Sequence, residues 1–268
     1  MTSIVAAGRE AEGCIFCGAG RLTREHVFPR WLVTILTTDI VGPEVTSERT
    51  RRTSGGATET QRWAAGDVAS YTVRVVCATC NNGWMSEIEA RAQAVLSTMV
   101  AGERTSLSPA AQMDVAAWTV LKGYIVEYAL GGAIVATPEE RRALMEARHP
   151  AGAVAVRVGA VERSGIPNSV TRIVYTVGRK GTREGMAVCT TFALGCALLQ
   201  VCYGLGITID WTRVSEPRTD HVPINPPCPG EVQWPPAVVL DSRSLGAWER
   251  PIRASDPGGI AGAGNSVA

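Results

Sequence analysis

Apolar residues recur with helical spacing along the middle of the chain. Between positions 84 and 100 they mark one face of a helix, at Trp84, Ile88, Val95 and Met99. The stretch from 108 to 130 begins with Ser-Pro and is apolar almost throughout, so it predicts a second helix. A third helix is predicted to begin at Pro138, because Thr137 is a favourable N-cap and acidic residues follow in the first turn.

The pattern changes after position 152. Four stretches between 152 and 210 are rich in apolar and β-branched residues and are separated by glycine-rich turns, which predicts an antiparallel sheet of about four strands. Cys189, Cys196 and Cys202 lie in these stretches and are predicted to pack in the core as small apolar side chains. Cys228 lies between prolines and is predicted to be a loop thiol.

These patterns predict an α+β protein with two domains. Residues 1–105 contain two cysteine pairs and the first helix, and residues 106–255 contain two helices and the antiparallel sheet. Between positions 33 and 66, Gly, Thr, Ser and charged residues predominate, which predicts a flexible insertion. The final segment, 256–268, is rich in small residues and is predicted to be a disordered tail.

Charge and hydropathy narrow the class of protein. The formal net charge of +1 excludes a chain-wide polyanion-binding surface, so a charged partner would have to meet a local patch. There is no run of eighteen apolar residues and no basic, apolar leader at the N-terminus, so a cytoplasmic protein without a membrane partner is expected. In that compartment cysteines are more often thiols or metal ligands than disulfides.

Two C-x-x-C pairs are the clearest chemical motif. Cys14 and Cys17 form the first pair, and Cys77 and Cys80 form the second. In such a turn both thiolates can point at one ion, and four thiolates complete the tetrahedral shell of a structural Zn²⁺. Four buried cysteines without metal, or a redox-active pair, are the alternatives that the spacing leaves open.

Glu25 and His26 stand side by side shortly after the first cysteine pair. A carboxylate can hold a divalent ion against a phosphodiester, and an imidazole with a pKa near neutrality can take a proton from the attacking water. His26 is therefore a candidate general base and Glu25 a candidate metal ligand. The alternative is a surface pair that precedes a helix. The other two histidines, His149 and His221, are expected to have structural roles.

Taken together, C-x-x-C, "EHVFPRWL" and "VCATCNNGWMSEIE" resemble the HNH endonuclease family. The resemblance implies a ββα-metal finger in which Glu25 and Asn81 hold a catalytic Mg²⁺ or Mn²⁺, with Asn82 as the neighbouring candidate for the second ligand. Thr72 stands where the family has an Asn that orients the catalytic His, and no Asn lies between Cys17 and Cys80.

The resemblance implies an endonuclease of a host, phage or mobile element that hydrolyses phosphodiester bonds in nucleic acid, with DNA as the expected partner. Two alternatives differ from it in class. One is a degenerate finger that binds nucleic acid without cutting it, and the other is a zinc-stabilised module that binds a protein. Trp84, directly after the second cysteine pair, is expected to pack over the metal site rather than to stack on a base.

Overall fold

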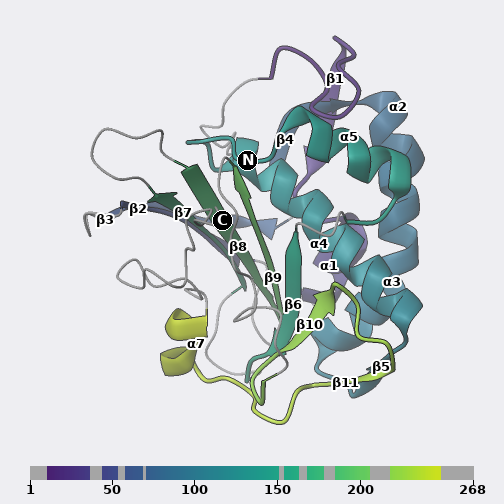
Figure 1. The fold of residues 1–268 in the computed structure, drawn as a ribbon, viewed down its shortest axis with the longest axis vertical. Coiled ribbons are helices and arrows are strands. Elements are labelled where there is room, and N and C mark those ends of the chain that lie inside the picture. Colours follow the sequence, from purple (N-terminus) through teal and green to yellow (C-terminus); the bar gives the residue numbers. More distant parts are fainter. Residues whose placement is uncertain are drawn as a thin grey trace, which may run out of the picture.

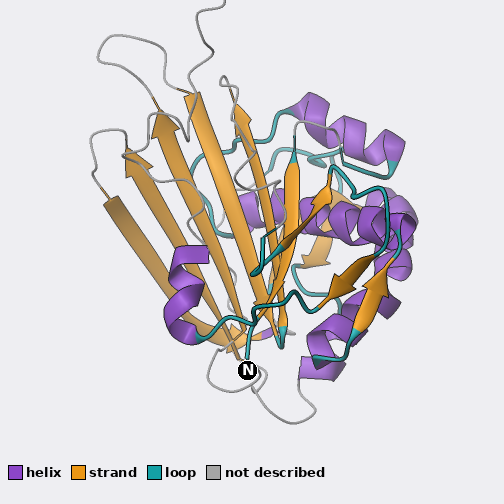
Figure 2. Cartoon of the chain, turned by 60° about the horizontal axis from the view of Figure 1, so that its bottom comes forward, coloured by secondary structure: helices purple, strands orange, loops and turns teal. Residues whose placement is uncertain are grey.

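A computed structural model describes residues 11–36, 44–53, 58–68, 71–150, 154–162, 168–177, 185–205 and 218–248. The fold is α+β, as expected: one broad sheet carries a layer of helices on one face (Figures 1 and 2). Among the described residues no helix is long and apolar enough to cross a membrane. The predicted tail lies outside the described residues.

The large sheet has seven strands in the order β10-β6-β9-β8-β7-β2-β3. Its centre is the antiparallel sheet predicted from the sequence, formed by β6 (Ala155–Ala160), β9 (Ala197–Leu205), β8 (Gly185–Leu194) and β7 (Asn168–Val177). A short strand, β10 (Val222–Asn225), pairs with β6 and completes one edge. Cys189, Cys196 and Cys202 are buried in or between these strands, which confirms their packing role.

The other edge of the sheet differs from the prediction. The segment expected to be a flexible insertion, 33–66, includes the end of α1 (Arg30–Leu36), all of β2 (Glu44–Thr53) and nearly all of β3 (Thr58–Asp67). β2 pairs antiparallel with β3 and parallel with β7, from Val45 opposite Asn168 to Thr53 opposite Thr176. The sequence of β2 is mostly polar and shows no alternation of apolar and polar residues. It contains several β-branched residues, Thr and Val, which suit a sheet edge once a partner strand is present.

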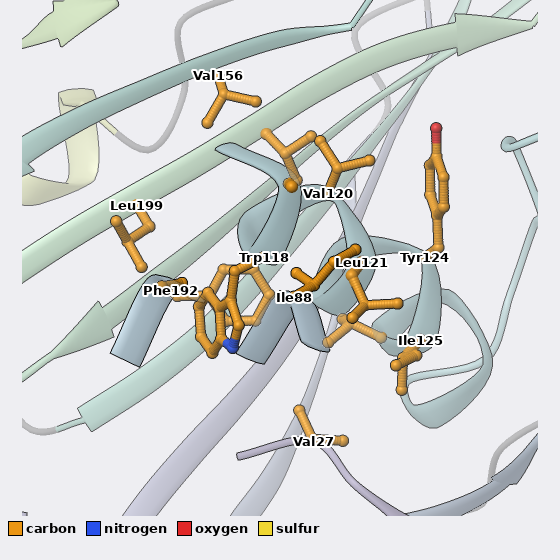
Figure 3. Packing of buried hydrophobic residues seen from close by; sticks show 14 of the residues in the cluster. Val27, Ile88, Trp118, Val120, Leu121, Tyr124, Ile125, Val156, Phe192 and Leu199 are labelled. Carbon is orange, nitrogen blue, oxygen red and sulfur yellow. The ribbon is translucent and has the colours of Figure 1, made fainter. Parts of the chain in front are cut away.

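Helix α4 (Pro109–Ala129) lies between the sheet and the N-terminal region. From Val115 to Ala129 it is buried on all sides, so this part of the helix shows no polar face. Figure 3 shows its Trp118 beside Phe192 of the sheet, and the centroids of the two rings are 6.0 Å apart. One core therefore joins residues from both predicted domains, including Val27, Ile88 and Leu199.

Smaller elements close the ends of the core. Helix α5 (Pro138–Ala147) begins with the predicted Thr137 cap, whose hydroxyl accepts from the Glu140 N–H while the Glu140 carboxylate accepts from the Thr137 N–H. β5 (Thr105–Leu107) pairs with β11 (Val232–Trp234), and α7 (Ser242–Trp248) covers the opposite face of the sheet, where Trp248 packs with Leu198.

Candidate metal centre and basic hairpin face

The four cysteines of the two pairs meet at one point. The sulfur atoms of Cys14, Cys17, Cys77 and Cys80 all lie within 4.8 Å of one another. Those of Cys17 and Cys77 are 3.5 Å apart. Four sulfurs at about 2.3 Å from a central zinc would be roughly 3.8 Å apart, so the cluster has the size and the ligand chemistry for a metal ion such as Zn²⁺. No other group of three metal-ligating side chains occurs within the described ranges.

Local turns bring the thiols together. In the first turn, the Gly18 N–H donates to the Cys14 carbonyl at 2.8 Å, and Gly18 has a φ of 78°, which favours glycine. In the second, the sulfur of Cys77 accepts from the Cys80 N–H at 3.4 Å and caps the following helix. The Ile15 N–H donates to the Val75 carbonyl at 2.9 Å, which fixes the two turns side by side.

The protein environment already favours a thiolate at one of the four positions. Burial acts to raise the pKa of the Cys77 thiol, but the Cys80 N–H and the neighbouring thiols outweigh it and lower the pKa to about 7. Burial raises the pKa of Cys80 and, to a smaller extent, that of Cys17. A metal ion would supply the positive charge that keeps all four sulfurs deprotonated.

The two cysteine turns flank a ββα unit. β1 (Leu22–His26) pairs antiparallel with β4 (Thr72–Cys77), and the chain then enters a helix through α2 (Ala78–Cys80), a π-helical turn (Asn81–Met85) and α3 (Ser86–Ala101). Trp84 is buried and meets Phe16 edge-on at a centroid distance of 4.9 Å. This confirms its packing role over the metal site.

The antiparallel pair of β1 and β4 is called the hairpin, although β2 and β3 lie between these strands in sequence. Glu25 and His26 point to opposite sides of this hairpin, because successive residues of a strand alternate. Glu25 is 5% exposed, whereas His26 is half-buried at the end of β1, directly opposite Thr72. Burial lowers the pKa of His26, an effect that the nearby Glu25 carboxylate partly offsets. At neutral pH the imidazole is therefore uncharged and able to accept a proton.

The Glu25 carboxylate binds a lysine. The ammonium of Lys122, on α4, lies 2.6 Å from Glu25 Oε1 and 2.6 Å from Glu89 Oε1, and it donates to the His26 carbonyl at 2.9 Å. Lys122 is fully buried. Burial alone would lower the pKa of Lys122, but the Glu25 and Glu89 carboxylates outweigh it and raise that pKa, so the side chain is charged.

Asn81 lies at the start of the π-helical turn. Its amide nitrogen donates to Thr23 Oγ1 and to the Arg24 carbonyl, both at 3.4 Å, and so ties the start of the helix to β1. Asn82 is exposed. Glu25 and Asn81 thus have separate hydrogen-bond partners. The carboxylate oxygen of Glu25 is bound to Lys122, whereas the bonds of Asn81 use its amide nitrogen and not the oxygen that would bind an ion.

Two arginines face each other on the exposed side of the hairpin. Arg24 on β1 is opposite Arg74 on β4, and both side chains are exposed. His26 follows Arg24 by two residues and therefore lies on the same face. Within the described part of the chain neither arginine has an acidic partner. A pair of uncompensated guanidinium groups next to a neutral imidazole is a surface suited to an anion.

Sequence reasoning missed both Lys122 and the arginine pair. A single lysine inside the apolar stretch "AAWTVLKGYIVEY" is the signal that could have revealed a buried ion pair. The arginine pair left no comparable signal, because acidic residues elsewhere cancel it in a count of charge and only the strand register brings Arg24 and Arg74 together.

Comparisons with known proteins add no family to this description. No family model, no curated protein and no solved structure matches the chain.

Proposed function

We propose that the protein is an HNH-like hydrolase that acts on the phosphodiester backbone of nucleic acid, with DNA as the expected substrate. The observation that carries the proposal is the exposed hairpin face, where Arg24 and Arg74 stand opposite each other beside His26. Guanidinium groups make bidentate contacts with phosphate, and such contacts supply most of the affinity of proteins for nucleic acid. The four-cysteine site would hold zinc and keep this face rigid.

His26 supplies the chemistry in this proposal. Its neutral imidazole takes a proton from a water molecule, whose oxygen forms a bond to phosphorus while the bond from phosphorus to the 3′ oxygen breaks. The leaving oxygen takes a proton from solvent and becomes a 3′-hydroxyl, and the imidazolium returns its proton to solvent. Arg24 and Arg74 would offset the charge that develops on the phosphate oxygens.

The catalytic Mg²⁺ or Mn²⁺ that the resemblance implies does not fit the residues present. The Glu25 carboxylate is bound to the Lys122 ammonium, which already supplies the positive charge that the ion would bring. The reaction proposed for His26 therefore uses no such ion. The same observation favours a second candidate function, in which the hairpin face binds nucleic acid without cutting it.

Two measurements test these functions separately. Binding to labelled duplex DNA, followed by fluorescence anisotropy over a range of salt concentrations, should weaken by about tenfold or more in the double variant Arg24→Gln, Arg74→Gln, with a shallower salt dependence. Arg104→Gln is a matched control, because Arg104 is exposed but lies beyond the far end of α3. Unchanged binding in the double variant would refute the role of the hairpin face.

Cleavage is measured as nicking of supercoiled plasmid in Mg²⁺, in Mn²⁺ and in EDTA. If His26 is the general base, His26→Ala abolishes nicking and leaves duplex binding intact. If the wild-type protein binds DNA but does not nick it under any of these conditions, the binding function stands and hydrolysis is excluded. Nicking that occurs only with added metal would show that a divalent ion takes part in the reaction.

A further inference from the structure

The Lys122 ammonium has three N–H donors, and the structure satisfies each of them. The acceptors are a carboxylate oxygen of Glu25, a carboxylate oxygen of Glu89 and the carbonyl of His26. Lys122 is fully buried, the side chain of Glu25 is 7% exposed and that of Glu89 is 24% exposed. The ammonium itself is therefore shielded from water, although the Glu89 carboxylate reaches the surface in part.

The three acceptors all belong to the ββα unit, whereas the lysine comes from outside it. Glu25 and His26 end strand β1, Glu89 lies on α3, and Lys122 lies on α4. Two carboxylates and a peptide carbonyl are the oxygen ligands that Mg²⁺, Mn²⁺ and Ca²⁺ prefer. Without Lys122 the two carboxylates would be close together with no compensating charge, which is costly in a buried place.

We infer that Lys122 is the resident cation of this strand–helix carboxylate pair, and that it takes the place between Glu25 and Glu89 that a divalent ion would otherwise fill. The wild-type chain then binds metal at its four cysteines but no divalent ion at the hairpin.

This inference does not depend on the hydrolysis proposed above, because it concerns cation binding only. The probe is Mn²⁺ alone, added to zinc-loaded full-length protein and followed by electron paramagnetic resonance of the free ion. We expect no Mn²⁺ binding by the wild type. Lys122→Gln keeps a side chain of similar size, removes the charge and frees both carboxylates, so it should gain one bound Mn²⁺ per chain at concentrations where the wild type binds none.

Two further variants show where the ion binds. Lys122→Gln combined with Glu25→Gln should lose the gained Mn²⁺ binding, and Lys122→Arg, which keeps the positive charge, should not gain it. If Lys122→Gln is poorly folded, its melting temperature should rise on addition of Mn²⁺, because a ligand that binds the native state stabilises it. That of the wild type should not change.

Two results would overturn the inference. The first is tight Mn²⁺ binding by the wild type that Glu25→Gln abolishes, since the ion would then displace Lys122. The second is a Lys122→Gln protein that neither binds Mn²⁺ nor is stabilised by it. Binding of Lys122→Gln to duplex DNA should be unchanged, because Arg24 and Arg74 are still present. This measurement distinguishes a failure of the inference about Lys122 from a failure of the proposed function.

Discussion

Arg24 and Arg74 are direct cross-strand neighbours in a two-stranded sheet, and both carry the same charge. Like charges at opposing positions destabilise an antiparallel pair by a few tenths of a kcal/mol to about 1 kcal/mol. Arg74→Thr, which introduces a good strand former, should therefore increase the free energy of unfolding by about that amount while it weakens binding to duplex DNA.

Urea denaturation at low and at high salt measures this effect. The stability gain of Arg74→Thr should shrink at high salt, because salt screens the repulsion in the wild type. A variant that is less stable than the wild type at low salt would show that the arginine pair serves the fold and not a ligand.

The four-cysteine site should contain one zinc ion per chain. Cys80→Ser removes one ligand from a cluster whose other members come from two separate turns, so the protein should lose its zinc and several kcal/mol of unfolding free energy. Elemental analysis and thermal denaturation are the measurements. Cys228→Ser is the matched control, since Cys228 lies near the Pro223 carbonyl and away from the cluster, and it should keep the zinc.

His221 should make the stability depend on pH. It is 1% exposed, and burial, together with the nearby Arg157, lowers its pKa from 6.5 to about 4. The unfolded chain binds the proton below about pH 6.5 and the folded protein binds it only near pH 4. His221 therefore stabilises the fold above pH 6.5, and on the order of 3 kcal/mol is lost as the pH falls through that window.

Denaturant unfolding of the wild type and of His221→Gln at several values between pH 7.5 and pH 4.5 measures this contribution. Loss of zinc on acidification affects both proteins alike, so the difference between their slopes isolates His221. Parallel pH profiles would show that the imidazole does not resist protonation.

Glu127 and Arg172 form a second buried ion pair, between α4 and β7. Both side chains are fully buried, with 3.0 Å between the guanidinium and the carboxylate. The carboxylate also accepts from the Val135 N–H at 3.0 Å. Glu127→Ala leaves Arg172 charged and unpaired, so it should cost about 3–5 kcal/mol in unfolding free energy. Glu103→Ala, at an exposed position, should cost less than about 0.5 kcal/mol.

The parts of the fold that sequence predicted depend on local chemistry. Helix α5 follows from Thr137 and Pro138, and the two cysteine turns follow from their own spacing, so neither needed knowledge of a distant partner. The central strands were visible because they are rich in apolar and β-branched residues. The convergence of Glu25, Glu89 and Lys122 could not be predicted, because it depends on how three separate elements pack.

The edge strands β2 and β3 were not predicted from the sequence, for a related reason. β2 is polar, and what makes it a strand is pairing with β3 and with β7. The charge of the hairpin face was likewise hidden, since Arg24 and Arg74 are far apart in sequence and become neighbours only through the register of β1 and β4. Sequence therefore located the candidate metal centre but not the surface beside it.

The parallel pairing of β2 with β7 has a consequence for how the protein is made. Ribosomes synthesise roughly 5–20 residues per second, and residues 168–177 of β7 follow β2 by more than a hundred positions. During that interval β2 can pair only with β3, and its other side presents unsatisfied backbone groups. The cysteine turns and the β1–β4 strand pair are complete once residue 80 has been synthesised. β2, which lies between β1 and β4 in sequence, gains its second partner strand only after β7 has been synthesised.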